Sequence, residues 1–196
     1  MNKQRVLDPS RTAVVVVDVQ RAFTDLFGVP VTPALAEVLP NISRFLTGAR
    51  EAGATVFLVR LVIAPDEHSK NTLIWSESLR EQLRPGAPGT EWDPCIVPHP
   101  GDVEVVKQRY SSFFGTDLDA MLRERNTETV VICGLTTNVC VQSTVRDCWQ
   151  RDYHTITLSD CCGEVGEGAH AAALSSIARS FGAVHSSETV LTMLNP

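Results

Sequence analysis

Three residues whose side chains could perform chemistry together stand far apart in the sequence: Asp18, Lys107 and Cys140. A deprotonated thiol attacks carbonyl carbons, a carboxylate can accept the thiol proton, and an ammonium group can stabilise the resulting anion. Together these residue types predict nucleophilic chemistry on a carbonyl compound. The prediction depends on a fold that brings the three side chains to one place.

The surroundings of Cys140 favour a reactive thiol. A helix is predicted from about 138 to 152, so Cys140 lies in its first turn, where unpaired N–H groups and the helix dipole lower the pKa of a thiol. The same amides could bind an oxyanion. Taken singly, each residue also has a simpler interpretation: Asp18 caps a loop, Lys107 is a solvated strand end and Cys140 is a small core residue.

The elements that must position these residues alternate between β-rich apolar runs and helical periodicities. The predicted strands are residues 12–19, 54–62, 103–108, 128–134, 154–160 and 183–187. The predicted helices lie around residues 42–49 and over 117–125, 138–152 and 167–181. Nearly continuous valine in "TAVVVVDV" is typical of a strand that is buried on both faces of a parallel sheet. The pattern predicts one three-layer α/β/α domain over residues 1–196, with a central, mostly parallel six-stranded sheet.

This fold predicts one location for the three reactive residues. The carboxyl ends of parallel strands lie along one edge of the sheet, and ligands bind in the crevice there. Asp18 and Lys107 close their strands, and Cys140 follows the strand predicted over residues 128–134. Their joint placement on this edge favours a functional site over three unrelated structural roles.

Composition limits the class of protein. The chain has 196 residues, of which 43% are hydrophobic and 20% charged, with a formal net charge of −6. These values are typical of a globular protein and give no basis for a nucleic-acid or anionic-membrane partner. The first residues do not resemble a signal peptide, and no apolar run is long enough to cross a membrane. We therefore expect a cytoplasmic protein.

The six cysteines form no C-x-x-C pair, although Cys161 and Cys162 are adjacent. In a reducing compartment they are expected to be thiols, most of them buried. Glycine-rich "GEVGEG" (163–168) is predicted to be a loop, because its glutamates would repel phosphate. His154, His170 and His185 are predicted to be packing or hydrogen-bonding residues.

Four blocks of the sequence, 14–23, 105–122, 130–153 and 159–174, resemble the isochorismatase-like cysteine hydrolases. The resemblance implies that Asp18, Lys107 and Cys140 form the catalytic triad of the family's amidases. It also implies a cis peptide at Leu135–Thr136 and an oxyanion hole made by the amides of Thr136 and Cys140. By this resemblance the chain hydrolyses the C–N bond of a small linear amide, such as a carbamoyl or ureido compound, through a thioester and without a cofactor.

The resemblance also leaves alternatives. The family's isochorismatases cleave a vinyl ether without the cysteine, and its nicotinamidases use a metal held by an Asp-x-His pair with another histidine close behind. Here Asp66 and His68 are present, but the next histidine is His99, so we predict no metal site. A non-catalytic binding module that keeps only the fold is a further alternative. Family members are usually dimers or tetramers, which predicts a homodimer or homotetramer with a small-molecule substrate as its other partner.

The residues predicted to bind the substrate surround the triad in sequence. They are Phe23, Trp75, Arg109, Tyr110, Phe113 and Thr137. For each aromatic residue a place in the core is an equally good interpretation. The irregular segment 64–100 is predicted to shape the pocket, because a long loop inside a compact domain is usually functional.

Overall fold

The computed structural model describes residues 6–24, 31–32, 35–64, 75–165 and 168–195. The strands are β1 (Thr12–Val17), β2 (Val31–Thr32), β3 (Thr55–Leu61), β4 (Val103–Lys107), β5 (Thr129–Leu135), β6 (His154–Val165) and β7 (Ala183–His185). The helices are α1 (Arg21–Thr24), α2 (Leu35–Ala52), α3 (Glu77–Gln82), α4 (Leu118–Glu124), α5 (Gln142–Trp149), α6 (Ala169–Ser180) and α7 (Ser187–Leu194).

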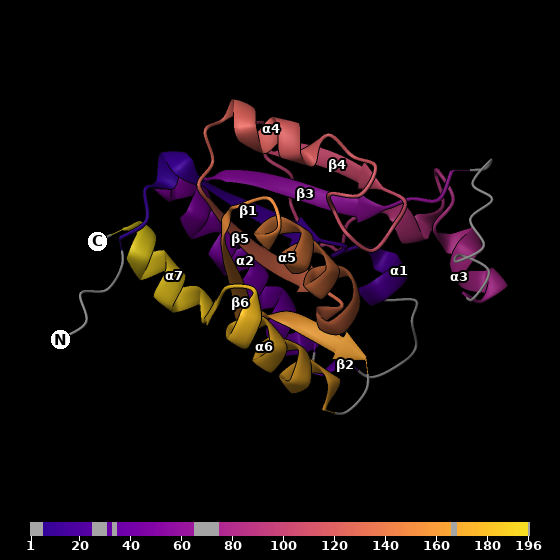
Figure 1. Cartoon of the computed structure of the whole chain (residues 1–196). Coiled ribbons are helices and arrows are strands. Elements are labelled where there is room, and N and C mark those ends of the chain that lie inside the picture. The colour runs from indigo at the N-terminus through magenta and orange to yellow at the C-terminus, as the bar shows by residue number, and fades with distance from the viewer. Residues whose placement is uncertain (1–5, 25–30, 33–34, 65–74, 166–167, 196) are drawn as a thin grey trace.

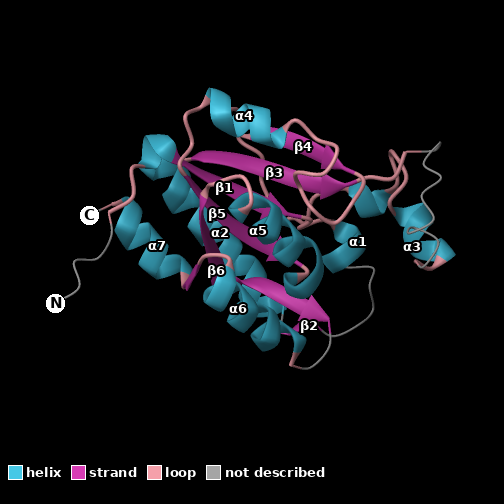
Figure 2. Ribbon diagram, in the orientation of Figure 1, coloured by secondary structure: helices cyan, strands magenta, loops and turns pink. Residues whose placement is uncertain are grey.

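Six of the strands form a parallel sheet in the order β4-β3-β1-β5-β6-β7, and the short β2 adds to β6 in the antiparallel direction. Figure 2 shows the strands fanning across the molecule with helices in front of and behind them. The predicted three-layer fold with its six-stranded parallel sheet is confirmed.

β1 is the centre of the sheet because its sequence can be buried on both faces. All six of its residues are buried, between β3 on one side and β5 on the other. Branched valine side chains pack well on both surfaces of a pleated strand, so an uninterrupted apolar run is stable here. Asp18, directly after this strand, is therefore placed at the middle of one sheet edge.

The helices cover both faces of the sheet. α2 packs on one face together with α7, and its buried side chains Ile42, Phe45, Leu46 and Ala49 follow the predicted periodicity. α5 and α6 pack against each other on the opposite face, in front of β5 and β6 in Figure 1. The described helices include none that is long and apolar enough to cross a membrane.

Several elements differ from the sequence prediction, among them α3, which lies in the segment that was predicted to be irregular. β6 continues through Val165 where a loop was expected, because β5 pairs with Cys162 and Gly163 and β2 pairs with Glu164 and Val165. The last predicted strand ends at His185, and the residues after it form α7, whose first turn is capped by the Ser186 hydroxyl. Finally, the helix after β5 begins with a wide π-helical turn over Thr137–Val141 before α5.

Candidate active site

The winding of the chain reverses at the carboxyl ends of β1 and β5. From β1 the chain proceeds outward to β3 and β4, and then it returns to β5 on the other side of β1 (Figure 1). Such a switch point opens a crevice at the sheet edge, where ligands bind in α/β proteins. Asp18 follows β1 and Cys140 follows β5, so both border this crevice.

Asp18 and Lys107 form a buried ion pair. Lys107 ends β4, two strands away from β1, and its side chain reaches over β3 to place Nζ 2.7 Å from Asp18 Oδ2. Both side chains are fully buried. Lys107 Nζ also donates to the carbonyl oxygen of Arg109 at 2.9 Å. The second carboxylate oxygen, Asp18 Oδ1, is buried and has no hydrogen-bond partner among the described residues.

The backbone of Asp18 aims its side chain at this place. Its φ is +53°, in the left-handed region that only glycine, asparagine and aspartate enter readily. Its N–H donates to the Val59 carbonyl oxygen at 2.8 Å, which fixes the turn against β3. An aspartate therefore suits this position both for its conformation and for its carboxylate.

Cys140 lies beside the Asp18–Lys107 pair. Its thiol feels the charges of both side chains and is within hydrogen-bonding reach of both. The residue is 6% exposed, against 0% for Asp18 and 1% for Lys107. Cys140 is thus the least buried residue of the three, and the ion pair beside it is withdrawn from solvent.

Burial is the largest influence on the protonation of the three groups. It raises the pKa of the Cys140 thiol, against the opposing effect of the Lys107 charge. It also raises the pKa of Asp18, again against the Lys107 charge, which makes this carboxylate a stronger base than an exposed one. For Lys107 burial lowers the pKa, but the charges of Asp18 and Cys140 outweigh it and the net direction is upward, so the ammonium stays charged.

Gly134 sets the path of the chain between β5 and the cysteine. Its φ is +121°, and a Cβ at this position would lie 2.0 Å from the Val17 carbonyl oxygen. Only glycine permits β5 to approach the end of β1 so closely. The peptide bond between Leu135 and Thr136 is cis. Behind it, the amides of Val139 and Val141 both donate to the Thr136 carbonyl oxygen, at 3.2 and 3.1 Å.

Glu164 and His170 hold the cysteine turn from the β6 side; the sequence predicted a packing or hydrogen-bonding role for His170 but no such role for Glu164. Glu164 is 4% exposed and accepts the Asn138 N–H through Oε2, while its Oε1 accepts the Val165 N–H at 2.8 Å. His170 Nδ1 lies 2.9 Å from the Thr137 hydroxyl. Burial lowers the pKa of His170, with the Glu164 charge acting in the opposite direction. The "GEVGEG" stretch gives no sign of this, since the pairing of β6 with β2 is a tertiary event.

The residues predicted to bind substrate fall into separate places. Trp75 and Tyr110 form one unit, since the indole N–H donates to the Tyr110 hydroxyl at 3.0 Å and their rings are 5.8 Å apart. Phe23 is half-buried and packs with Trp75 against a small apolar cluster that includes Leu61. Phe113 instead occupies the core. Of the two interpretations of Phe113, a place in the core is the correct one, because its ring stacks on Tyr153.

Two other predicted substrate-binding residues have defined surroundings. Thr137 is the first residue of the turn and is fully buried, with its hydroxyl 2.9 Å from His170 Nδ1. Arg109 lines a cavity of about 340 Å³ beside the edge strand β4. Asp66 and His68 lie outside the described residues. Within the described part of the chain, no three histidine, cysteine, aspartate or glutamate side chains are grouped as metal ligands would be.

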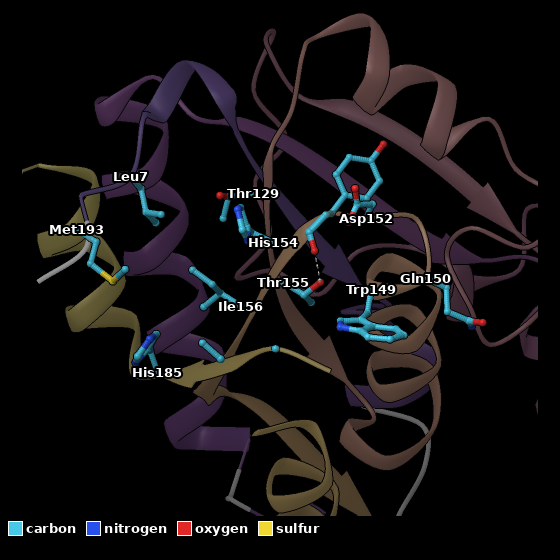
Figure 3. A pocket seen from close by; sticks show the side chains of 13 residues that line it. Leu7, Thr129, Trp149, Gln150, Asp152, His154, Thr155, Ile156, His185 and Met193 are labelled. Carbon is cyan, nitrogen blue, oxygen red and sulfur yellow. Dashed lines mark hydrogen bonds between the residues drawn. The ribbon is translucent and has the colours of Figure 1, made fainter. Parts of the chain in front are cut away.

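A second cavity, of about 910 Å³, lies at the opposite edge of the sheet, where β5, β6 and β7 begin (Figure 3). Its lining includes Thr129, Trp149, His154 and His185, and none of the three reactive residues contributes to it. The Asp18–Lys107 pair and the cavity of about 910 Å³ are therefore at opposite ends of the strands.

Comparison with known proteins decides the family. Residues 12–189 match the model of the isochorismatase domain. The chain belongs to the isochorismatase family. It is 37% identical to the ureidoacrylate amidohydrolase RutB of Methylobacterium radiotolerans, over 90% of this chain and 76% of that protein.

Solved structures of isochorismatase-like proteins superpose on the same fold. A cysteine hydrolase from Pseudomonas syringae pv. phaseolicola is 31% identical, with a TM-score of 0.88 over 100% of this chain and 99% of that one. N-carbamoylsarcosine amidase from Thermoplasma acidophilum is 28% identical, with a TM-score of 0.78 over 91% of this chain and 97% of that one. The chain is an isochorismatase-family amidohydrolase, and this membership argues against a non-catalytic binding module.

Proposed function

We propose that this amidohydrolase cleaves the C–N bond of a small carbamoyl or ureido compound, with Cys140 as its covalent nucleophile. The observation that carries the proposal is the position of Cys140 beside the buried Asp18–Lys107 pair, whose two charges both act on its thiol. A buried carboxylate with a raised pKa is a suitable general base for a thiol, and the ammonium beside it stabilises the thiolate that forms.

In the first half-reaction Asp18 accepts the thiol proton of Cys140 and the sulfur attacks the substrate carbonyl carbon. The unpartnered Asp18 Oδ1 is the oxygen available for this proton, because Oδ2 binds Lys107. The amides of Thr136 and Cys140 bind the tetrahedral oxyanion. The C–N bond then breaks, Asp18 returns the proton to the leaving nitrogen, and ammonia or an amine departs from a thioester.

In the second half-reaction water hydrolyses the thioester. Asp18 accepts a proton from the attacking water, the C–S bond breaks, and the proton passes to sulfur, which regenerates the thiol. Lys107 remains charged throughout and holds Asp18 in place. Each proton that leaves one group is received by another, so the cycle consumes only substrate and water.

Two relatives support the substrate class. One is named for ureidoacrylate and the other for N-carbamoylsarcosine, and both compounds carry a carbamoyl group on nitrogen. Such a group offers a carbonyl carbon for the thiolate to attack and a terminal NH₂ that can leave as ammonia. We include in this proposal the prediction of a cytoplasmic homodimer or homotetramer.

The test is ammonia release from N-carbamoylsarcosine, ureidoacrylate and a series of other ureido and carbamoyl acids. The expected result is turnover of at least one compound, together with a mass increase on Cys140 when the reaction is stopped early. The test variant is Cys140→Ala. Its matched control is Cys148→Ala, which removes another buried thiol, on α5. Cys140→Ala should lower kcat by about 10⁴-fold or more, whereas Cys148→Ala should retain it.

Retained turnover in Cys140→Ala would refute the covalent mechanism. Pyruvate release from isochorismate without ammonia from any amide would instead establish the vinyl ether alternative. Because both products are measured from the same enzyme preparation, the two reactions can be separated.

A further inference from the structure

Thr144, one helical turn after Cys140, joins the nucleophile to a distant loop. Its hydroxyl donates to the Cys140 carbonyl oxygen at 2.8 Å. Threonine hydroxyls often donate to a carbonyl four residues earlier in a helix, so this bond alone is ordinary. The Thr144 hydroxyl oxygen, however, also lies 3.0 Å from the Ser112 amide nitrogen and 3.1 Å from the Ser112 hydroxyl oxygen.

The direction of these bonds follows from counting protons. The single hydroxyl proton of Thr144 is used on the Cys140 carbonyl, so the Ser112 N–H and O–H must both donate to Thr144 Oγ1. Ser112 and Thr144 are both fully buried, and water cannot replace any of these bonds. The Ser112 carbonyl oxygen in turn accepts the Thr116 hydroxyl at 2.6 Å. The group is therefore fully paired and has one arrangement.

The loop that carries Ser112 also carries the partner of the lysine. It begins directly after Lys107, whose ammonium donates to the Arg109 carbonyl oxygen at 2.9 Å, and it leads into α4. One segment thus contacts the ammonium near its start and the nucleophile's turn at Ser112. The spacing between the thiol and the charged pair depends on both attachments.

We propose that Thr144 and Ser112 are positioning residues that set the place of the Cys140 thiol relative to Lys107 and Asp18. The inference rests on the proposed function, because it assumes that Cys140 is the nucleophile. Without the Thr144 hydroxyl, two buried donors of Ser112 lose their acceptor, and the loop and the turn move apart to satisfy them. The thiol is then displaced from its base, which lowers the rate of the chemical step more than it affects substrate binding.

The experiment compares Thr144→Val, which removes the hydroxyl and keeps the shape, with Thr144→Ser, which keeps the hydroxyl. Two readouts are taken: kcat and KM on the amide substrate, and the rate at which iodoacetamide labels Cys140, followed by peptide mass. For Thr144→Val we expect kcat to fall on the order of 10²-fold with little change in KM, and the labelling rate to change as well. Thr144→Ser should restore both.

Thr12→Val is the matched control for lost stability. Thr12 is a buried threonine whose hydroxyl donates to the Asp8 carbonyl oxygen at 2.7 Å, also four residues earlier, but it lies at the start of β1, away from the site. It should lower the melting temperature without altering kcat or labelling. Ser112→Ala, which leaves the Ser112 N–H in place, should give an intermediate loss and serves if Thr144→Val does not fold.

Unchanged kcat and labelling in Thr144→Val or in Ser112→Ala would overturn the positioning role, as would an equal loss in Thr12→Val. Labelling needs no substrate, so it tests the role of Thr144 even if the amide substrate is wrong. Retained activity in Cys140→Ala, by contrast, would refute the proposed mechanism itself.

Discussion

At the carboxyl end of the strands the protein buries charge, whereas at the amino end it leaves open space. The Asp18–Lys107 pair is fully buried at the first end, beside Cys140, which is 6% exposed. The second end holds a cavity of about 910 Å³ whose lining mixes polar and apolar side chains. Removing two charges from water is costly, and hydrophobic residues would often fill such a place at least as stably.

The difference teaches that arrangement, more than volume, marks a reactive site. Titratable groups with perturbed pKa values cluster at functional sites, and a fold maintains such buried charges at a cost. The amino-end cavity contains His154 and His185, but the structure shows no comparable ion pair among its lining residues, all of which are described. The following comparisons pair one change at each end.

The largest difference is expected between the ion pairs. Asp18→Asn leaves the Lys107 ammonium buried without its counter-charge, which should destabilise the fold by about 3–5 kcal/mol. It also removes the proposed base and should lower kcat by about 10²–10⁴-fold. Glu128→Gln, at the amino end, breaks an exposed pair with Arg11 and should cost less than about 1 kcal/mol with no loss of activity.

Urea unfolding and ammonia release measure the two effects of this first comparison. Equal stability losses at the two ends would show that the buried pair is no more important than a surface one. Full activity in Asp18→Asn would remove that carboxylate from the mechanism.

Two glycines provide the second comparison, because both lack room for a side chain. A Cβ on Gly134 would lie 2.0 Å from the Val17 carbonyl oxygen, and one on Gly182 would lie 2.3 Å from that of Thr155. We expect each alanine variant to lose about 1–3 kcal/mol or more, measured by thermal unfolding. Only Gly134→Ala should lose activity per folded molecule, on the order of tenfold or more, since Gly134 leads into the cysteine turn. A comparable activity loss in Gly182→Ala would count against this separation.

Two tryptophans give a third and smaller comparison. Trp75→Phe removes the indole N–H that binds the Tyr110 hydroxyl, and a single exposed hydrogen bond corresponds to a change in KM of roughly two- to tenfold. Trp149→Phe, at the amino-end cavity, keeps an aromatic ring against Phe181 and should leave KM unchanged. Steady-state kinetics on the substrate from the ammonia assay would decide, and identical KM values in the two variants would remove Trp75 from the binding residues.

The smallest effect concerns pH. Burial lowers the pKa of His170 from its ordinary value of 6.5, so the folded protein binds this proton less tightly than the unfolded chain. Its contribution to stability is complete above that value and is lost as the pH falls through the lowered folded pKa. The melting temperature of His170→Gln should therefore fall less steeply below about pH 6.5 than that of the parent protein. Parallel pH profiles would contradict this.

The clustering of Asp18, Lys107 and Cys140 could be predicted because each residue lies at or after the carboxyl end of a predicted strand. The valine run before Asp18 and the apolar runs before Lys107 and Cys140 predict buried parallel strands, and parallel strands bring their carboxyl ends together. What the sequence could not provide is how each side chain is held. Thr144 and Ser112 are 32 residues apart, and nothing local to either indicates that they bond.

The errors in the predicted elements have the same cause. The sequence predicts a loop after residue 160, but β5 pairs with Cys162 and Gly163, and β2 pairs with Glu164 and Val165. The sequence predicts that the strand continues to residue 187, but the Ser186 hydroxyl caps a helix there and Asp160 accepts hydrogen bonds from the Ser187 N–H and hydroxyl. In both places a distant partner outweighs the local pattern, which is why the centre of the sheet was easier to predict than its margins.

The winding of the sheet has a consequence for how activity could be divided. The proposed triad draws one residue from each of three separate parts of the chain, at positions 18, 107 and 140, and β1 joins them only when β3 and β5 are both paired with it. A break between α4 and β5 would give two fragments, neither of which contains all three residues. Turnover would then require complementation of the fragments, so the enzyme could serve as its own reporter of reassembly.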